Sequence, residues 1–328
     1  MTRLLLRVAE ERFRVAGTFT ISRGSRTEIR VVTVELHDGA FCGRGECVPY
    51  QRYGETVEGV IETIRSLAED LSNGLDRIGL LSRLPAGAAR NALDCAFWDL
   101  EAKRSGLAVW KLAGLPPPAR LSTAYTLSLG EPGSMRDAAV QNAHRPLLKI
   151  KLGSDRDAER IEAIRSGAPH STLIVDANEG WTIDQYLDLA PHLVSMGVAL
   201  VEQPLPAGAD EVLREIVRPL PICADESCHD RHSLKDLVGK YDAVNIKLDK
   251  TGGLTEALEL KREALNAGFD LMVGCMLGTS LAMAPAFLVA QGARYVDLDA
   301  PLLLAEDREI AVQYNGSVME PPTGSLWG

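Results

Sequence analysis

The 328-residue sequence lacks the features that mark several classes of protein. It has no run of about 18 apolar residues free of charges, the length a membrane-spanning helix needs, so we expect a soluble protein without a membrane partner. Lys and Arg total 35 against 45 Asp and Glu, and the formal charge of −10 disfavours nucleic acid as a partner. The six cysteines include no C-x-x-C pair, which predicts reduced thiols and a cytoplasmic location rather than a disulfide framework.

What the sequence does contain begins with a small α+β pattern. Alternating apolar and polar residues at 29–36 and 40–47 predict an antiparallel hairpin. Apolar residues recur at helical spacing over 56–71 and 88–103, and Gly106 provides a helix stop. Three consecutive prolines at 116–118 cannot continue a helix, so we place a domain boundary there.

Beyond this boundary, short apolar runs alternate with segments of about 15 residues at helical spacing. The runs lie at 147–152, 172–175, 198–201, 221–224, 243–248, 271–273 and 295–298. This alternation predicts an α/β fold with a parallel sheet covered by helices, and the near-constant spacing predicts closure into a β/α barrel. An open doubly wound sheet is the alternative, but the G-x-G-x-x-G turn expected after its first strand is absent.

A chemically functional residue stands at or just after the end of each run. These residues are Lys151, Asp176, Glu202, Asp225, Lys247, Cys275 and Asp297. They follow one another at intervals of 22 to 28 residues, about the length of one strand-and-helix unit. We therefore expect all seven at the C-terminal rim of the barrel, where strand ends face a common space.

Three of these residues are acidic and come from consecutive strands: Asp176 in VDANEG, Glu202 in VEQP and Asp225 in ADES. Carboxylates that converge in a poorly solvated barrel mouth favour a hard divalent cation such as Mg²⁺. The alternative interpretation is that each acid pairs separately with a neighbouring lysine or caps the following helix.

Lysines flank the acids. Lys149 and Lys151 lie two apart on one strand and so face the same side, while Lys247 comes four strands later, across the barrel. Neighbouring ammonium groups beside a cation are expected to depress each other's pKa towards the range of a general base. Two such bases can take a proton from one face of a carbon and return one to the other. The alternative for the KIK segment is a solvated edge whose lysine stems lie along the surface.

Asp297 and Asp299 place two further carboxylates on one strand face. We expect this pair to bind a cationic substrate group such as an ammonium, and a salt bridge to a rim lysine is the alternative. None of the six histidines falls on the strand-end series, which disfavours catalysis based on histidine.

Several segments carry a resemblance to a known family. KIKLG, VDANEGW, VEQP, ADES and NIKLDKTGGL, in this order, resemble the muconate-cycloisomerase-like branch of the enolase superfamily. RGSRTE, GECVPYQRYGE, LPAGAARNALDCAFWDL and DLDAP resemble the bacterial dipeptide epimerases of that branch, which act on L-Ala-D/L-Glu in murein peptide recycling. The resemblance covers nearly the whole chain. It implies a (β/α)7β TIM-like barrel over 119–304, capped by an α+β domain of residues 1–118 and by the C-terminal segment from about 305 to 328.

The resemblance also implies a mechanism for this chain. Asp176, Glu202 and Asp225 match the ligands of one Mg²⁺ per subunit. Lys151 and Lys247 match the two acid/base catalysts that exchange the α-proton of the substrate through an enediolate, which inverts the carbon.

Further residues match substrate contacts of the family. Lys149 matches a lysine at the substrate carboxylate, and Thr126 a threonine at the substrate. Asp297 and Asp299 match the pair that holds the α-ammonium of a dipeptide. Arg23 and Arg26 both fit the arginine expected at the substrate's side-chain carboxylate.

Other reactions stay open at this point. The same metal and lysines serve cycloisomerisation or β-elimination, as in o-succinylbenzoate synthesis. A Schiff-base aldolase with Lys151 or Lys247 as nucleophile belongs to another class of enzyme, and a metal-dependent binding protein would have no activity. Assembly into a homo-oligomer is also left open.

Overall fold

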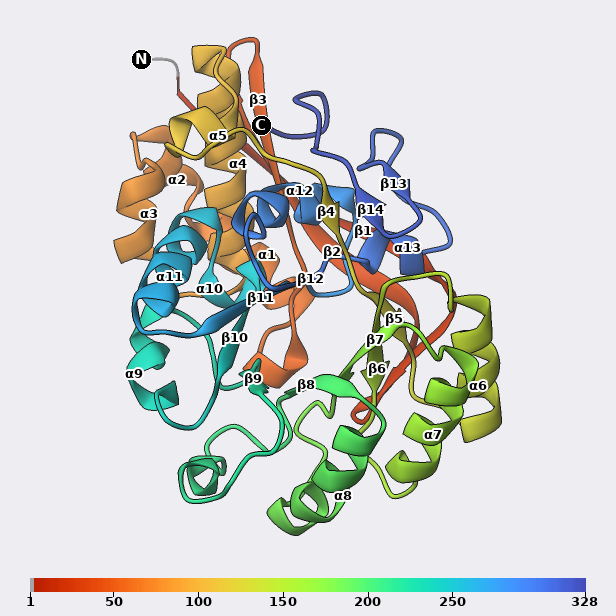
Figure 1. The fold of residues 1–328 in the computed structure, drawn as a ribbon. Helices are drawn as coiled ribbons and strands as arrows, with labels where there is room; N and C mark the ends of the chain where they lie inside the picture. The colour runs from red at the N-terminus through yellow and green to blue at the C-terminus, as the bar shows by residue number, and fades with distance from the viewer. Residues whose placement is uncertain (1–2) are drawn as a thin grey trace.

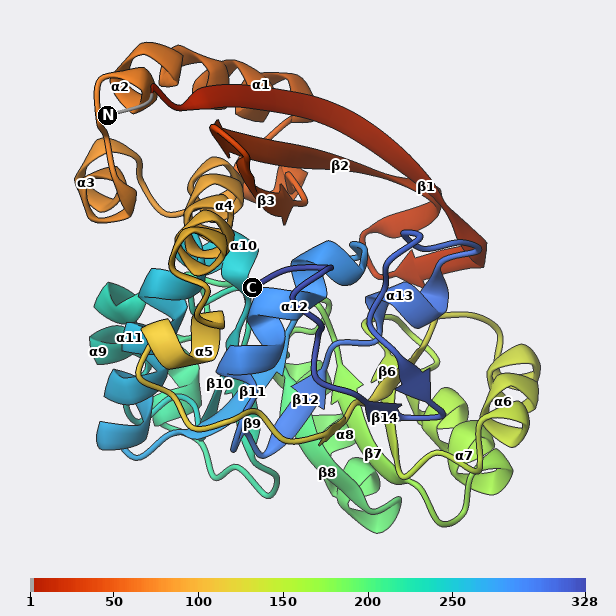
Figure 2. The same cartoon turned by 90° about the horizontal axis from the view of Figure 1, so that it is seen from above.

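A three-stranded antiparallel sheet forms the N-terminal part of the chain in the computed structural model, which describes residues 3–328. Its strands are β1 (Leu5–Ile21), β2 (Gly24–Asp38) and β3 (Phe41–Cys47). β2 and β3 form the predicted hairpin, with His37 opposite Cys42. The long strand β1 was not anticipated. It pairs with β2 almost from end to end, and the two strands arch over the rest of the molecule (Figure 2).

Helices pack on one face of this sheet. Those in contact with its strands are α1 (Val57–Ser66), α2 (Ala68–Ser72) and α4 (Ala88–Ser105), after the 3-10 turn η1 (Gln51–Tyr53). The helices α3 (Arg77–Arg83) and α5 (Val109–Leu112) lie against α4. The helix predicted over 88–103 is confirmed as α4, and Gly106 ends it in the left-handed conformation (φ 68°). The prediction of a single helix over 56–71 is wrong, since the helix is interrupted at Leu67, which separates α1 from α2.

Two glycines allow α4 to approach the sheet closely. A Cβ atom at Gly43 would lie 2.1 Å from the carbonyl oxygen of Ala96, and one at Gly45 would lie 2.1 Å from that of Ala92. The apolar residues of β2 that share this face are buried in one core with α1 and α4. The opposite face of the sheet therefore carries the side chains of the alternate residues.

Eight parallel strands form the second sheet (Figure 1). They are β5 (Tyr125–Leu127), β6 (Leu147–Lys151), β7 (Thr172–Asp176), β8 (Val198–Glu202), β9 (Ile222–Ala224), β10 (Ala243–Ile246), β11 (Asp270–Gly274) and β12 (Tyr295–Asp297). All seven predicted runs are confirmed as strands in sequential order, whereas the apolar pattern missed the short β5. The sheet is a barrel rather than an open sheet, because the N–H of Ala124 donates to the carbonyl of Val296, 2.7 Å away, and joins the two ends.

Helices cover the outside of the barrel: α6 (Pro132–Gln141), α7 (Asp157–Gly167), α8 (Ile183–Ser195), α11 (Leu254–Asn266) and α12 (Ser280–Val289). The prediction of a helix of about 15 residues after every strand is wrong for β8 and β9. Only η2 (Glu211–Arg214) follows β8, where four prolines interrupt residues 204–221, and η3 (Arg231–Ser233) and α9 (Leu234–Leu237) follow β9. Within residues 3–328 no helix has the length and apolar character needed to cross a membrane.

The C-terminal segment returns to both parts of the fold. After α13 (Ala300–Leu303), β13 (Tyr314–Asn315) and β14 (Val318–Met319) form a small sheet with β4 (Leu121–Ser122). The indole N–H of Trp327 then donates to the carbonyl of Cys95 in α4, over 3.0 Å. The last residues thus lie against the N-terminal unit, as the resemblance implies. The division at 118 and 304 stays a prediction.

Candidate active site

Three carboxylates meet inside the barrel mouth. Asp176 and Glu202 are the last residues of β7 and β8, and Asp225 follows β9 directly. One oxygen from each lies within 4.8 Å of the other two, and the three residues are at most 2% exposed. The strand-end positions that the spacing selects are therefore close in space on three adjacent strands.

Each of the three acids also has a lysine partner. Lys151 Nζ lies 2.6 Å from Asp176, Lys149 Nζ lies 2.7 Å from Glu202, and Lys247 Nζ lies 2.5 Å from Asp225. The sequence analysis treated convergence of the three acids and pairing of each acid with a lysine as alternatives, but the structure contains both. Because the lysines balance these charges, the argument that a cation is needed for neutrality alone no longer holds.

The expected depression of the lysine pKa values is wrong for two of the lysines. Burial opposes the charged form of Lys149, but Asp297, Glu202 and Asp176 raise its pKa well above the usual value. Burial likewise opposes ionisation of Lys247, and Asp225 raises the pKa of this lysine. The nearby carboxylates outweigh the neighbouring ammonium groups, which the sequence argument treated as dominant.

The acids respond differently to the same surroundings. Burial, followed by the repulsion of Asp176, raises the pKa of Glu202 to about 7. Burial also opposes ionisation of Asp225, but Lys247 and Lys250 hold the pKa of Asp225 well below its usual value. Glu202 is therefore the carboxylate of the cluster that gains most from an additional positive charge.

Lys250 and Asn245 complete the cluster and were missed by the sequence analysis. The fully buried Lys250 ammonium donates to the side chain and the carbonyl of Asp225, both at 2.5 Å, and to the carbonyl of Asn245 at 2.9 Å. The amide of Asn245 donates to Glu202 at 2.7 Å. Lys250 and Asn245 both belong to the segment NIKLDK, which the sequence analysis did identify. They were missed because only one residue, Lys247, was selected at the end of this strand. Lys250 lies in the short helix α10 (Leu248–Thr251), one turn beyond Lys247.

A cavity of about 80 Å³ connects the two proposed catalytic lysines. Lys151 from β6 and Lys247 after β10 both line it, together with Asp225. The N-terminal unit covers it with residues around the β1–β2 turn and around η1, including Arg26 near the start of β2, Tyr50 and Tyr53. Since β6 and β10 are separated by three strands in the eight-stranded order, the lysines approach this space from opposite sides of the barrel.

Asp297 and Asp299 lie beside this space, not on the cavity wall. The Asp297 carboxylate accepts from Lys149 at 2.6 Å, so the salt-bridge alternative is realised here, while its Oδ1 is buried with no hydrogen-bond partner among the described residues. The Asp299 carboxylate accepts from the backbone N–H of Thr126 at 2.6 Å. Burial, and after it the charge of Asp297, raises the pKa of Asp299 to about 7.

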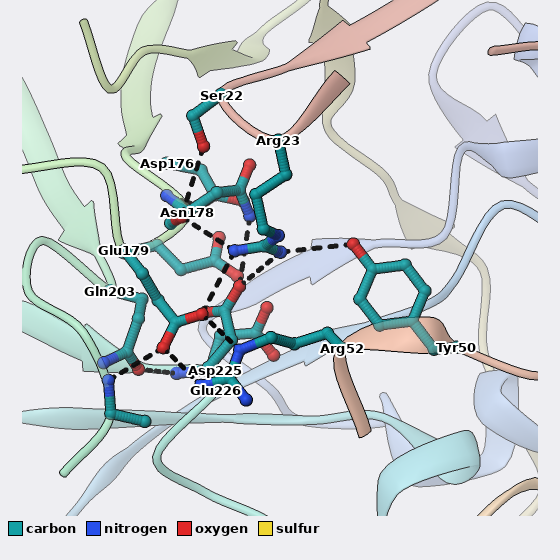
Figure 3. Close-up of polar contacts among 12 residues, drawn as sticks. Ser22, Arg23, Tyr50, Arg52, Asp176, Asn178, Glu179, Gln203, Asp225 and Glu226 are labelled. Atoms are coloured by element: carbon teal, nitrogen blue, oxygen red, sulfur yellow. Dashed lines mark hydrogen bonds and ion pairs between the residues drawn. The ribbon is translucent and has the colours of Figure 1, made fainter. Parts of the chain in front are cut away.

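Arg23 and Arg26 differ clearly in their surroundings. Arg23 donates to the carbonyl of Asn178 and to Glu226, both at 2.7 Å, and to the Tyr50 hydroxyl at 3.1 Å (Figure 3). Both guanidinium groups lie over the Tyr50 ring, 5.9 Å (Arg23) and 5.4 Å (Arg26) from its centroid, but the Arg26 side chain has no hydrogen bond or ion pair within residues 3–328. Arg26 is therefore the arginine of the two that is free to bind a ligand in the cavity.

Comparison with known families shows which family this chain belongs to. Residues 4–114 match the N-terminal domain of the mandelate racemase and muconate lactonizing enzyme family, and residues 134–324 match the enolase C-terminal domain-like family. The chain belongs to the enolase superfamily. It is 49% identical to the L-Ala-D/L-Glu epimerase of Escherichia coli K12 over 94% of this chain and 97% of the relative. It is 46% identical to an N-acetyl-D-glutamate racemase of a Pseudoalteromonas species, over 91% and 95% of the two chains. The protein is thus an enzyme of the isomerase class.

Solved structures of this superfamily match over almost the whole chain. An Agrobacterium tumefaciens protein with homology to dipeptide epimerases, crystallised with sodium and L-Ala-L-Glu, is 53% identical and covers 99% of this chain and 100% of its own, with a TM-score of 0.97. The dipeptide epimerase of Cytophaga hutchinsonii, in complex with Mg and D-Ala-L-Val, is 28% identical and covers 98% and 94%, with a TM-score of 0.91.

Proposed function

We propose that this protein epimerises dipeptides, inverting the α-carbon of the C-terminal residue, and that L-Ala-D-Glu to L-Ala-L-Glu is its main reaction, in murein peptide recycling. The observation that carries the proposal is the approach of Lys151 and Lys247 to one cavity from opposite sides of the barrel. An inversion by proton transfer needs two groups of this kind, one on each face of the carbon. The identity to an L-Ala-D/L-Glu epimerase supports the choice of substrate.

The acid cluster fits a divalent cation, and we propose one Mg²⁺ per subunit. Asp176, Glu202 and Asp225 offer hard oxygen donors from three strands at close range. Within the part of the chain that the structure describes, Glu202 Oε2 has no hydrogen-bond partner, although it lies 2.7 Å from Lys149 Nζ. The Mg-bound structure of a related epimerase supports this choice of ion. When bound, the ion supplies positive charge that stabilises the carboxylate of the substrate as it gains a second negative charge.

The chain's own residues perform the proton transfer. The lysine that acts as base must start in its neutral form. In the free site Asp225 holds the pKa of Lys247 high, so additional positive charge at the acids would be needed to release its proton. The neutral lysine then takes the α-proton and becomes an ammonium, which leaves an enediolate. The opposite lysine, already an ammonium, delivers its proton to the other face of the same carbon and becomes neutral. The product has the inverted configuration, and the lysines exchange roles in the reverse direction. The Tyr50 and Tyr53 loop covers the cavity and keeps water away from the carbanion.

Recognition of the two ends of the substrate follows from the remaining charges. Asp297 has a buried oxygen that no other residue of 3–328 hydrogen-bonds, which suits the α-ammonium of the dipeptide, with Asp299 and Thr126 beside it. We assign Lys149 to the substrate carboxylate because it matches the family's lysine at that place; without substrate it pairs with Asp176, Glu202 and Asp297. Arg26 has a guanidinium available in the cavity, whereas Arg23 is bound to Glu226, so we assign the side-chain carboxylate of glutamate to Arg26.

The function is tested by incubating the protein with Mg²⁺ and dipeptides in D₂O and following the mass and configuration of the C-terminal residue. Deuterium is expected at its α-carbon, fastest for Ala-Glu and slower for Ala-Gln. The variant Arg26→Gln should reduce this preference for glutamate, whereas loss of the preference is not expected on replacing the surface residue Arg14.

The absence of exchange in every dipeptide would refute epimerisation and favour a binding protein. Trapping of substrate by borohydride would instead favour a Schiff-base aldolase, and ring opening or elimination without exchange would favour the cycloisomerase or o-succinylbenzoate synthase reaction.

Racemisation of N-acetyl-glutamate is a second candidate, because a relative with 46% identity has that activity. N-acetyl-D-glutamate shares the glutamate end of the dipeptide but has no ammonium group. The variant Asp297→Asn removes one charge at the proposed ammonium site. We expect it to raise KM for L-Ala-D-Glu by about 10- to 100-fold, the value of one charged hydrogen bond, and to leave turnover of N-acetyl-D-glutamate and the affinity for Mg²⁺ nearly unchanged. An equal loss with both substrates, or a large loss of metal, would show that Asp297 does not bind the ammonium.

A further inference from the structure

A second group of possible metal ligands lies far from the barrel in the sequence, on the β2–β3 hairpin of the N-terminal sheet. It consists of Glu35, His37 and Cys42, and all three side chains are partly exposed. Glu35 and His37 are two residues apart on β2 and therefore face the same side. Cys42 is the cross-strand partner of His37, so its side chain also lies on that side.

This side of the hairpin is not covered by the helix that packs on the sheet. Gly43 and Gly45 face α4 so closely that neither position could hold a Cβ without a clash. Cys42, which precedes Gly43 on the strand, must therefore point to the opposite face. The three side chains thus lie on the face opposite α4, partly exposed beside the turn at Gly39, while Arg44 and Glu46 further along the same face contact the C-terminal segment.

The carboxylate of Glu35 and the sulfur of Cys42 both lie close to the ring nitrogen Nε2 of His37. His37 Nε2 lies 2.9 Å from a carboxylate oxygen of Glu35 and 3.8 Å from the sulfur of Cys42, and all three atoms lie within 4.8 Å of one another. In a tetrahedral zinc site, with Zn–N near 2.0 Å and Zn–S near 2.3 Å, neighbouring ligand atoms are roughly 3.5 Å apart. Small side-chain movements would therefore bring the three atoms to the corners of such a site.

We propose that Glu35, His37 and Cys42 bind a divalent cation of the zinc class, with water as the fourth ligand. One imidazole, one thiolate and one carboxylate form a donor set that prefers Zn²⁺ and is poorly suited to Mg²⁺. The thiolate and the carboxylate together neutralise the charge of the ion. The barrel cluster contains only oxygen donors, so the two sites select different ions from a mixture.

An ion at this site links β2 to β3 next to their connecting turn. The hairpin carries Val48 and Tyr50 shortly after β3, and these residues line the cavity above the barrel. The site is distinct from the proposed catalytic centre and does not depend on the proposed reaction. Its expected effect is on the stability of the N-terminal sheet.

The test uses Co²⁺ as a spectroscopic substitute for Zn²⁺, added to the full-length protein in the presence of excess Mg²⁺ and a reducing agent that does not bind metals. One equivalent of Co²⁺ is expected to produce near-ultraviolet absorption from thiolate-to-cobalt charge transfer, and Zn²⁺ should abolish it and raise the melting temperature. The variants Cys42→Ser and His37→Gln should each lose the absorption. Cys275→Ser is the matched control, because Cys275 is the other partly exposed cysteine and lines the active-site cavity.

Three outcomes would overturn the proposal. These are the absence of charge-transfer absorption in the wild-type protein, its persistence in Cys42→Ser, and its loss only in Cys275→Ser. Circular dichroism of each variant establishes that it is folded, and His37→Gln gives a second readout that leaves the thiol intact. Deuterium exchange into dipeptides is expected to stay unchanged in Cys42→Ser, which separates failure of this site from failure of the proposed function.

Discussion

Replacement of either Lys151 or Lys247 by methionine is expected to abolish epimerisation of L-Ala-D-Glu while leaving hydrogen exchange with one of the two diastereomers. Each lysine approaches the cavity from its own side, so each can reach the α-proton of only one configuration. Loss of one acid/base group should lower the epimerisation rate by at least about 10²- to 10⁴-fold. The measurement is deuterium incorporation from D₂O into L-Ala-L-Glu and L-Ala-D-Glu, with both variants and both substrates.

The informative result is the reversal between the variants. If Lys151→Met retains exchange with one diastereomer, Lys247→Met should retain it with the other. Methionine keeps most of the side-chain volume and removes the charge, but it leaves Asp176 or Asp225 without one lysine partner. Asp225 keeps Lys250 and Asp176 keeps Lys149, so both variants are expected to fold. Loss of exchange with both diastereomers in both folded variants would contradict a mechanism with two independent bases.

Removal of divalent ions by EDTA is expected to lower the epimerisation rate by about 10³-fold or more, and Mg²⁺ should restore it. Stabilisation of the doubly charged substrate carboxylate is worth several kcal/mol, and about 4 kcal/mol corresponds to this factor. The initial rate is measured before and after chelation and during titration with Mg²⁺, with Ca²⁺ as a comparison ion.

The same treatment should have little effect on the fold. Asp176, Glu202 and Asp225 each have a lysine within 2.7 Å, so their charges stay balanced after the ion is removed. Circular dichroism is therefore expected to be unchanged by EDTA, with a small decrease in melting temperature. Full activity in EDTA would eliminate the metal-dependent mechanism. Unfolding in EDTA that Mg²⁺ alone reverses would show that the barrel ion has a structural role that the lysines do not replace.

The architecture of the barrel follows largely from local pattern. Seven strands, their order and the closeness of Asp176, Glu202 and Asp225 could be predicted, because a parallel barrel places equivalent strand ends at one rim. β5 could not be predicted from pattern, since a three-residue strand is too short to show a period. The break between α1 and α2 at Leu67 also escaped, because the apolar spacing continues through it.

The electrostatics of the site required the three-dimensional structure. The sequence indicates which residues are charged, but the pKa of Lys149 depends on Asp297, Glu202 and Asp176, which come from three other strands. Lys250 was overlooked for a related reason, since its contact with Asp225 forms only when α10 turns back over the end of β9. Likewise, RGSR could not separate Arg23 from Arg26, whereas the ion pair of Arg23 with Glu226 does.

The seam between β5 and β12 has a consequence for how such enzymes diversify. The residues proposed to transfer protons and to hold the ion lie on β6 to β10, which continuous strand pairing joins. Asp297, Asp299 and Thr126 instead lie where the sheet ends meet, joined by the Ala124–Val296 hydrogen bond and by the N–H of Leu298 donating to the Thr123 hydroxyl. If these residues bind the amino-terminal end of the dipeptide as proposed, substitutions at the seam would change which amino-terminal residue is accepted without displacing the reactive groups. Such a division is consistent with relatives that are named for different dipeptides.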